Sequence, residues 1–302
     1  MQHPQLGRYP AARHVIAQVS DTHLLRGGAP LGGVADTVLA LAQVSAQLER
    51  LGGRVDAIVV TGDVADLGEP DAYRLARSAL EPLADRMGSR LVWVMGNHDE
   101  RAAFRSELLG EPASDAPVHR VVEVDGLRII ALDSTVPDYH HGELDDAASQ
   151  SSAAALDEPA EHGTVIALHH APIATPLALM DVLELRGQDR LADVVRGRDV
   201  RVILGGHLHY ATNGTFAGIP VSVAGATAYT MDLSASPRDL VGVDGGRSFS
   251  LVHLYTDGVV TSVVPVGPYP AVTTLDEAFL DEIESLSPEA RLERFSRKLG
   301  TV

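Results

Sequence analysis

Five short segments of the chain carry side chains that bind metal ions, and each follows a run of β-forming apolar residues. The segments are Asp21-Thr22-His23, Gly62-Asp63, Gly96-Asn97-His98-Asp99, His169-His170 and Gly206-His207-Leu208-His209. Open α/β folds build their sites in loops that follow the carboxyl ends of sheet strands. A single histidine or aspartate after a strand is usually structural. The recurrence in five loops is what predicts one shared metal centre.

The donor atoms in these segments are carboxylate and amide oxygens and imidazole nitrogens. Such mixtures suit Mn, Fe, Zn or Co, and the chain contains no cysteine that could supply thiolates. About seven ligands exceed what one ion takes from a protein while keeping an open position. Two ions roughly 3.5–4 Å apart with a shared carboxylate accommodate them all, and such a pair can activate a hydroxide for attack on phosphorus. The pattern therefore predicts a metallohydrolase.

The elements that must position these loops alternate between strand and helix over the first hundred residues. Apolar runs and helical spacing predict strands at 14–20, 56–61 and 90–95 and helices at about 36–50, 70–87 and 100–109. Pro70 suits the first turn of the second helix. Because parallel strands of this kind end at one edge of a sheet, the ligand loops are expected to meet there.

Later parts of the chain favour antiparallel hairpins. Asp125-Gly126 is a strong turn signal between 119–124 and 127–132, and two further hairpins are expected over 215–224 and 249–266. Parallel units followed by hairpins predict an α/β sandwich whose second sheet is mixed.

Three segments carry weaker signals. Residues 145–163 hold few apolar anchors, so that any helix there is expected to be short or mobile, and 234–247 has the Gly, Pro and charge of a surface loop. Helical spacing over 275–299 is interrupted by Pro288, which should divide it into two helices. We expect a catalytic domain over 1–267 and a helical extension over 268–302.

The bulk composition restricts the partners. The formal net charge of −17 repels the phosphate backbone, so a nucleic-acid polymer is disfavoured. The sequence lacks an apolar run of the roughly 20 residues that a membrane span needs, and its start lacks the features of a signal peptide. A cytoplasmic protein without a transmembrane segment is expected.

In this order, the motifs Asp-x-His, Gly-Asp, Gly-Asn-His-Asp, a later His and Gly-His-x-His resemble those of the calcineurin-like metallophosphoesterases. More narrowly, Asp21-Thr22-His23-Leu24, the stretch 61–66 and Gly205-Gly206-His207-Leu208-His209 resemble class III cyclic nucleotide phosphodiesterases. The resemblance covers residues 1–210. It implies an α/β (α+β) fold, a four-layer metallophosphoesterase β-sandwich of two mixed sheets flanked by helices, and it suggests a homodimer.

The resemblance also assigns the metal ligands. It implies a first metal ion bound by Asp21, His23 and His209, with Asp63 bridging both ions. The second ion would be bound by Asn97, His169 and His207. The two ions are expected to be divalent or mixed-valence transition metals: Mn²⁺, Fe²⁺/Fe³⁺ or Zn²⁺.

Other residues near these ligands are expected to act on the substrate. The resemblance implies that His98 faces the substrate and donates a proton, and that Asp99 orients His98; capping of the following helix is an equal alternative for Asp99. Asn97 and His98 are expected to contact the substrate. His140 is either a phosphate contact or a surface-loop residue, and His170 is interpreted as structural.

The resulting hypothesis is a phosphoric diester hydrolase that cleaves small phosphodiesters with a metal-bridging hydroxide. The expected substrate is 3′,5′-cyclic AMP or a 2′,3′-cyclic nucleotide. A glycerophosphodiesterase or a broad-specificity phosphodiesterase and phosphomonoesterase is the alternative, because one metal pair serves all of these reactions. A non-catalytic scaffold is disfavoured because the chain keeps every ligand and His98.

Overall fold

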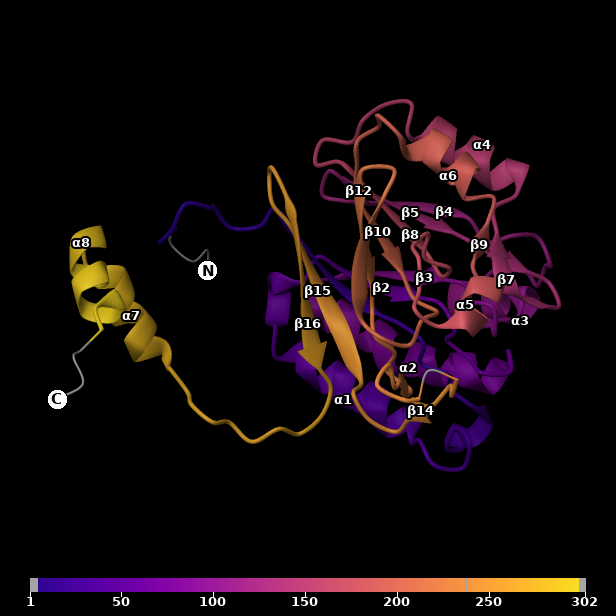
Figure 1. Cartoon of the computed structure of the whole chain (residues 1–302), viewed down its shortest axis with the longest axis horizontal. Helices are drawn as coiled ribbons and strands as arrows, with labels where there is room; N and C mark the ends of the chain where they lie inside the picture. Colours follow the sequence, from indigo (N-terminus) through magenta and orange to yellow (C-terminus); the bar gives the residue numbers. More distant parts are fainter. Residues whose placement is uncertain (1–4, 237, 299–302) are drawn as a thin grey trace. The chain divides into compact units, whose positions relative to one another are not determined.

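The computed structural model describes residues 5–236 and 238–298 (Figure 1). The chain divides into two compact units. One comprises residues 13–267, and the other contains the described parts of 1–12 and 268–302. The first unit holds every candidate site residue.

The first sheet of the larger unit has five strands in the order β16-β15-β1-β2-β3. These are β1 (His14–Val19), β2 (Ala57–Thr61), β3 (Arg90–Val94), β15 (Ser248–Leu254) and β16 (Val259–Pro265). The strands β1, β2 and β3 are parallel, whereas β15 pairs antiparallel with both β1 and β16. The three ligand loops that follow these parallel strands therefore lie at the same end of the sheet.

The second sheet has six strands in the order β11-β12-β10-β8-β5-β4. These are β4 (Arg120–Val124), β5 (Leu127–Leu132), β8 (Thr164–Leu168), β10 (Val200–Gly205), β11 (Thr212–Phe216) and β12 (Ile219–Val223). The four central strands are parallel, and hairpin partners flank them as antiparallel edges. The three expected hairpins are thus confirmed.

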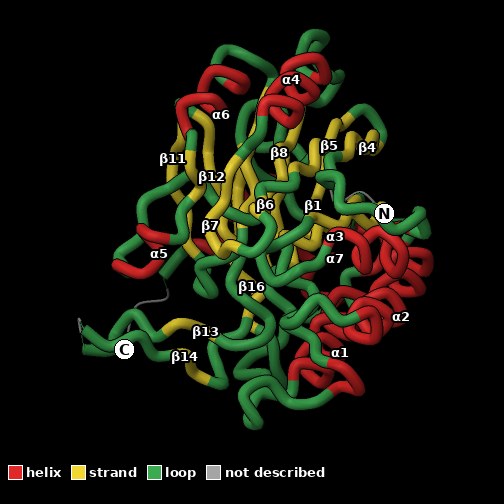
Figure 2. Tube along the Cα trace, turned by 90° about the vertical axis from the view of Figure 1, so that its right-hand side faces the viewer, coloured by secondary structure: helices red, strands yellow, loops and turns green. Residues whose placement is uncertain are grey.

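Helices cover the outer face of each sheet (Figure 2). Apolar residues of α1 (Thr37–Glu49) and α2 (Pro70–Met87) pack on the first sheet. Those of α4 (Asp146–Ala155) and α6 (Gln188–Val195) pack on the second. Between the sheets lies a third core of mainly β-branched residues, which joins the inner faces of both. The prediction of two mixed sheets flanked by helices is confirmed.

One buried polar side chain links the two sheets next to the ligand loops. Gln18 of β1 is fully buried, and its Nε2 donates a hydrogen bond to the carbonyl oxygen of Gly205 at 2.7 Å. Its Oε1 accepts from the Ser222 hydroxyl at 3.3 Å. Because a buried amide is costly unless it is hydrogen-bonded, these bonds fix the relative position of β1, β10 and β12.

The expectation of weak order over 145–163 is wrong. Residues 146–155 form α4, and the Asp145 carboxylate caps this helix by accepting from the Ala148 N–H at 2.6 Å. Ala148 and Leu156 are buried in the core of the second sheet. Small residues pack closely enough there that no aromatic anchor is required. The helix expected over 100–109 begins as α3 (Arg101–Phe104) and continues as a π turn over Arg105–Leu109.

Several short elements surround the ligand loops. They are β6 (Thr135–Val136), β7 (Tyr139–Glu143) and β9 (Leu185–Arg186) in one small sheet, β13 (Thr230–Met231) and β14 (Gly242–Val243) in another, and helix α5 (Ala178–Val182). The segment 234–247, expected as a surface loop, is mostly exposed but contributes β14.

The smaller unit contains α7 (Glu277–Ser285) and α8 (Pro288–Arg291), followed by a π turn over Leu292–Ser296. Pro288 occupies the first turn of α8, so the expected division at this residue is confirmed. No helix within residues 5–236 and 238–298 is long and apolar enough to cross a membrane. The assignment of 1–267 and 268–302 as separate domains stays a prediction.

Candidate metal centre

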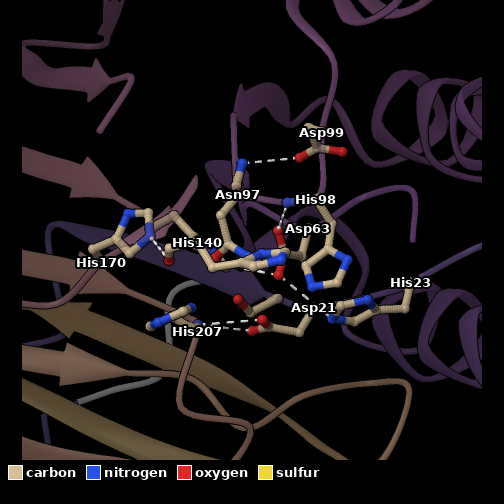
Figure 3. Close-up of polar contacts among 12 residues, drawn as sticks. Asp21, His23, Asp63, Asn97, His98, Asp99, His140, His170 and His207 are labelled. Carbon is tan, nitrogen blue, oxygen red and sulfur yellow. Dashed lines mark hydrogen bonds and ion pairs between the residues drawn. The ribbon is translucent and has the colours of Figure 1, made fainter. Parts of the chain in front are cut away.

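The structure brings all seven predicted ligands together. They lie in the loops after five strands: Asp21 and His23 after β1, Asp63 after β2, Asn97 after β3, His169 after β8, and His207 and His209 after β10. The first sheet supplies four of these residues and the second sheet supplies three, so the centre lies where the two sheets meet at their carboxyl ends. Figure 3 shows Asp21, Asp63, Asn97 and His207 converging on one region.

Five of the seven residues adopt a backbone conformation that most residues avoid. Their φ angles are +52° for Asp21, +42° for His23, +49° for Asp63, +71° for His207 and +59° for His209. In the described part of the chain only three other non-glycine residues have positive φ. Strained backbone of this kind persists where the surrounding structure demands it, and it concentrates at functional sites. The strain therefore supports the site independently of the motifs.

The first ligand group consists of Asp21, His23, Asp63 and His209, whose candidate donor atoms lie within 4.8 Å of one another. The Nε2 atoms of His23 and His209 are 3.0 Å apart. His23 Nε2 lies 3.5 Å from Asp63 Oδ2, and His209 Nε2 lies 3.4 Å from Asp21 Oδ1. Imidazole nitrogens and carboxylate oxygens facing a common point are the donor set of a transition-metal ion.

The second group shares Asp63 with the first. His169 Nε2 lies 3.3 Å from Asp63 Oδ2 and 3.1 Å from Asn97 Oδ1. The His169 and His207 rings are 5.0 Å apart. Because the same Asp63 oxygen faces both His23 and His169, its carboxylate is placed to join two ions.

Each of the four candidate ligand histidines has its second ring nitrogen bonded to an oxygen. His23 Nδ1 donates to Asp66, His169 Nδ1 to the Thr61 carbonyl and His209 Nδ1 to the Tyr229 carbonyl, at 2.9, 2.8 and 3.3 Å. His207 instead donates from Nε2 to the Leu183 carbonyl at 3.1 Å. Such bonds fix the tautomer and direct the remaining lone pair. The donor atoms are therefore Nε2 of His23, His169 and His209 and Nδ1 of His207.

Three glycines allow the loops to approach this closely. A Cβ on Gly96 would lie 2.2 Å from both the backbone nitrogen and Oδ1 of Asp63. A Cβ on Gly62 would lie 2.4 Å from His169 Nδ1, and one on Gly206 would lie 2.1 Å from Ser20 Oγ. Any side chain at these positions would displace a ligand or its support.

Buried charged groups of the centre interact strongly with one another. Burial favours the neutral form of Asp63, but the His169, His23 and His98 imidazoles outweigh it and hold its pKa well below the usual range. Burial likewise lowers the pKa of His169, yet Asp63 and Asp21 outweigh this effect and raise it to about 9. Carboxylates bind metal ions in their deprotonated form, which is the form that Asp63 keeps.

The other two imidazoles are held neutral. Burial and the neighbouring His169 lower the pKa of His207 to about 3, and burial and His23 lower that of His209 to about 3. Neutral imidazole is the form that ligates metals. The donor geometry therefore fits two metal ions, and His207 and His209 are already in the ligating form.

His98 lies beside the ligands but differs from them in its surroundings. Its side chain is 32% exposed, whereas the aspartate and histidine ligands are buried. Its backbone N–H donates to Asp63 Oδ1 at 2.9 Å, and its ring Nδ1 donates to the Asp66 carbonyl at 2.8 Å. Within the described part of the chain, Nε2 of His98 has no hydrogen-bond partner.

The expected role of Asp99 requires a correction. Its carboxylate accepts backbone N–H bonds from Val64, Ala65 and Gly96 at 3.2, 3.0 and 2.9 Å. Among the described residues it is therefore Asp66 that holds the His98 ring, and Asp99 instead ties two ligand loops together. Glu100, not Asp99, is the residue that precedes α3 as its N-cap. Burial and Asp63 raise the pKa of Asp99 to about 6.

His140 and His170 receive distinct positions. His140 lies in β7, and its Nδ1 lies 2.9 Å from Asn97 Nδ2, while its ring lies 5.1 Å from that of His98. The two nitrogens of the buried His170 bond to the Ser134 hydroxyl and the His140 carbonyl at 2.8 and 3.1 Å. With both nitrogens used, His170 positions His140, which supports its structural interpretation.

Two supporting residues could not be assigned a role at the centre from the sequence. Arg101 bonds to Asp133 at 2.9 Å and to the Thr135 carbonyl at 2.9 Å, which fixes the small sheet that carries His140. Tyr229 places its ring 4.2 Å from that of His209. No metal-binding motif includes these residues, since only the folded chain brings them to the loops.

A sandwich of two mixed sheets with a two-metal donor set at its carboxyl edge defines a phosphoesterase-type metallohydrolase. The family model of the calcineurin-like phosphoesterases matches residues 14–211. The chain belongs to this family, and the predicted resemblance is confirmed.

Individual relatives narrow the comparison. The chain is 49% identical to the cAMP/cGMP dual specificity phosphodiesterase of Mycobacterium tuberculosis, over 91% of this chain and 86% of the relative. It is 30% identical to the glycerophosphodiester phosphodiesterase GpdQ of Enterobacter lignolyticus, over 69% and 77% of the two chains. Both relatives are named as phosphodiesterases.

A solved structure supports the fold. A purple acid phosphatase from yellow lupin matches 85% of this chain with a TM-score of 0.55 and 12% sequence identity. The chain spans about half (53%) of that phosphatase. This likeness shows the shared sandwich architecture alone.

Proposed function

We propose that this chain is a dinuclear metal-dependent phosphodiesterase that hydrolyses small phosphodiesters, with 3′,5′-cyclic AMP or a 2′,3′-cyclic nucleotide as the natural substrate. The observation that carries the proposal is the partly exposed His98 ring beside the converging aspartate and histidine ligands. The 49% identity to a cAMP/cGMP phosphodiesterase supports the substrate class.

The proposed ligands are divided between two ions. Asp21, His23 and His209 hold the first, Asn97, His169 and His207 hold the second, and Asp63 is shared. When bound, such ions supply a nucleophilic oxygen at neutral pH and neutralise the charge of the phosphoryl group. Mn²⁺, Fe²⁺/Fe³⁺ and Zn²⁺ all suit nitrogen and oxygen donors.

Residues of the chain itself orient the substrate and supply a proton to it. The bond from His98 Nδ1 to the Asp66 carbonyl fixes the ring, so that Nε2 is the atom that delivers a proton to the leaving oxygen. A positioned acid of this kind contributes about 10²- to 10⁴-fold. The Asn97 amide, held by His140, lies on the same side and contacts the phosphoryl group.

A glycerophosphodiester is the second candidate substrate. The observation that favours it is the 30% identity to a glycerophosphodiester phosphodiesterase. Nucleic-acid polymers are disfavoured by the net charge of −17. The expectations of a homodimer and of a cytoplasmic location stay predictions.

A substrate panel tests the proposal. The Mn²⁺-loaded protein is assayed with 3′,5′-cyclic AMP, 2′,3′-cyclic AMP, glycerophosphocholine and bis(4-nitrophenyl) phosphate, with a chelated sample as control. We expect efficient hydrolysis of at least one cyclic nucleotide. Cleavage of the nitrophenyl ester alone would contradict the cyclic-nucleotide assignment.

The role of His98 is tested by His98→Ala, with His253→Ala as the matched control. His253 pairs with Val15 near the amino end of β1, the end of the strand opposite the ligand loops. We expect His98→Ala to lower kcat about 10²-fold or more while both metal ions remain bound. Loss of both metals in this variant would show that His98 is a ligand and not a proton donor.

A further inference from the structure

Tyr229 forms part of the wall of the candidate centre, although no ligand motif includes it. Its ring lies 4.2 Å from the His209 ring and 6.1 Å from the His23 ring. Both histidines belong to the first ligand group. The Tyr229 carbonyl also accepts the His209 Nδ1–H bond, so the residue contacts the centre through both its backbone and its side chain.

The backbone before Tyr229 is fixed to the first ligand loop. The Thr227 N–H donates to the Ser20 carbonyl at 3.0 Å, and the Ala228 N–H donates to the Asp21 carbonyl at 3.1 Å. Residues 224–228 are buried. The position of Tyr229 is therefore set by the same loop that supplies Asp21 and His23.

A glycine also lies against the ring. A Cβ on Gly242, in β14, would lie 2.8 Å from both Cδ2 and Cε2 of Tyr229. Only a residue without a side chain therefore fits in β14 at this distance. The ring lies close to both the His209 imidazole and Gly242, while Tyr229 as a whole is only partly buried.

Tyr229 is only partly buried, so its side chain can be reached by a ligand at the centre. A tyrosine hydroxyl keeps its proton at neutral pH and can therefore donate a hydrogen bond. Among residues 5–236 and 238–298 its hydroxyl has no hydrogen-bond partner. A part-buried donor without a partner beside a metal centre is suited to an anionic ligand.

His98 and His140 border the centre on the Asn97 side, with their rings 5.1 Å apart. Tyr229 borders it on the His209 side. We propose that Tyr229 is a substrate-binding residue whose hydroxyl donates a hydrogen bond to a phosphoryl oxygen of the bound phosphodiester. The inference rests on the proposed function, since it names a contact to the same phosphoryl group.

The test removes the hydroxyl and keeps the ring. Tyr229→Phe is compared with the wild-type protein and with Tyr255→Phe, because Tyr255 follows β15 near the amino end of β1, remote from the ligand loops. Each Mn²⁺-loaded protein is assayed for kcat and KM with bis(4-nitrophenyl) phosphate and 3′,5′-cyclic AMP. Binding of inorganic phosphate is measured separately by calorimetry.

We expect Tyr229→Phe to lower kcat/KM about 10- to 100-fold for both esters, the effect of losing one hydrogen bond to a charged group. Phosphate binding should weaken in the same direction, while metal content and thermal stability stay at the wild-type level. Tyr255→Phe should match the wild type in every measurement.

Unchanged kcat/KM and unchanged phosphate binding in Tyr229→Phe would overturn the inference. A wild-type protein that cleaves no diester would instead contradict the proposed function, and phosphate binding would still decide whether Tyr229 contacts a phosphoryl group. Tyr229→Leu, which also removes the ring edge, should reproduce the loss of phosphate binding; wild-type phosphate affinity in this second variant would equally overturn the inference.

Discussion

Replacement of Gly96 by alanine should disable the centre without removing any ligand. The added Cβ would lie 2.2 Å from both the backbone nitrogen and Oδ1 of Asp63, whereas ordinary contact begins at 3.4 Å. The difference, 3.4 − 2.2 = 1.2 Å, is the distance by which Asp63 must withdraw. One of these atoms is the backbone nitrogen of Asp63, so the loop itself has to move.

The expected magnitude follows from this displacement. Misplacement of a catalytic group by about 1 Å costs roughly 10²-fold in rate, and overpacking of a close contact costs about 1–3 kcal/mol in stability. We therefore expect Gly96→Ala to lower kcat at least about 100-fold and to reduce the bound metal. Since Asp63 is the shared carboxylate of the proposal, both ions should be affected.

Three quantities are measured: kcat for hydrolysis of bis(4-nitrophenyl) phosphate, metal content by mass spectrometry, and stability by urea unfolding. Gly258→Ala is the matched control, because a Cβ on Gly258 meets no atom within 4 Å and its φ is not in the left-handed range. It should behave like the wild type. A Gly96→Ala protein with wild-type kcat and full metal content would refute the reasoning.

Asp66→Asn should weaken binding of the first metal ion about 10- to 100-fold by loosening His23, as chelator competition would measure; unchanged affinity would contradict this role. Burial lowers the pKa of His14, so as the pH falls the unfolded chain binds a proton at this histidine before the folded chain does. The free energy of unfolding should therefore decrease below about pH 6.5, by at most ~1.4 kcal/mol per pH unit. The urea midpoint of His14→Gln should decrease less over the same pH range. Arg101→Met leaves the buried Asp133 unpaired and should cost about 3–5 kcal/mol; a loss in urea unfolding below about 1 kcal/mol would argue against it.

The sequence allowed prediction of the parallel strands and of the loops that follow them. The reason is physical: β-forming runs such as 56–61 are apolar on both faces, and a polar residue such as Asp63 marks the strand end. Parallel strands then place their ends at one edge, so that residues as distant in sequence as Asp21 and His209 converge.

The remaining contacts depend on how loops pack, which no local pattern encodes. Asp99 was expected to orient His98, but its carboxylate reaches backbone N–H groups of the loop after β2. Tyr229 reaches the centre only because Gly242 allows β14 to close behind it. Helix α4 forms on small buried residues that carry almost no hydrophobic signal.

Five of the seven proposed ligands have a left-handed backbone, a conformation that the site requires although it does not stabilise the fold. Such a conformation costs roughly 1–2 kcal/mol for a residue with a Cβ, and little for glycine. Replacing His23, His207 or His209 by glycine would relieve this backbone strain but would also remove a buried ring and its contacts. The five positions therefore mark where the fold gives up stability to hold the geometry of the ligands.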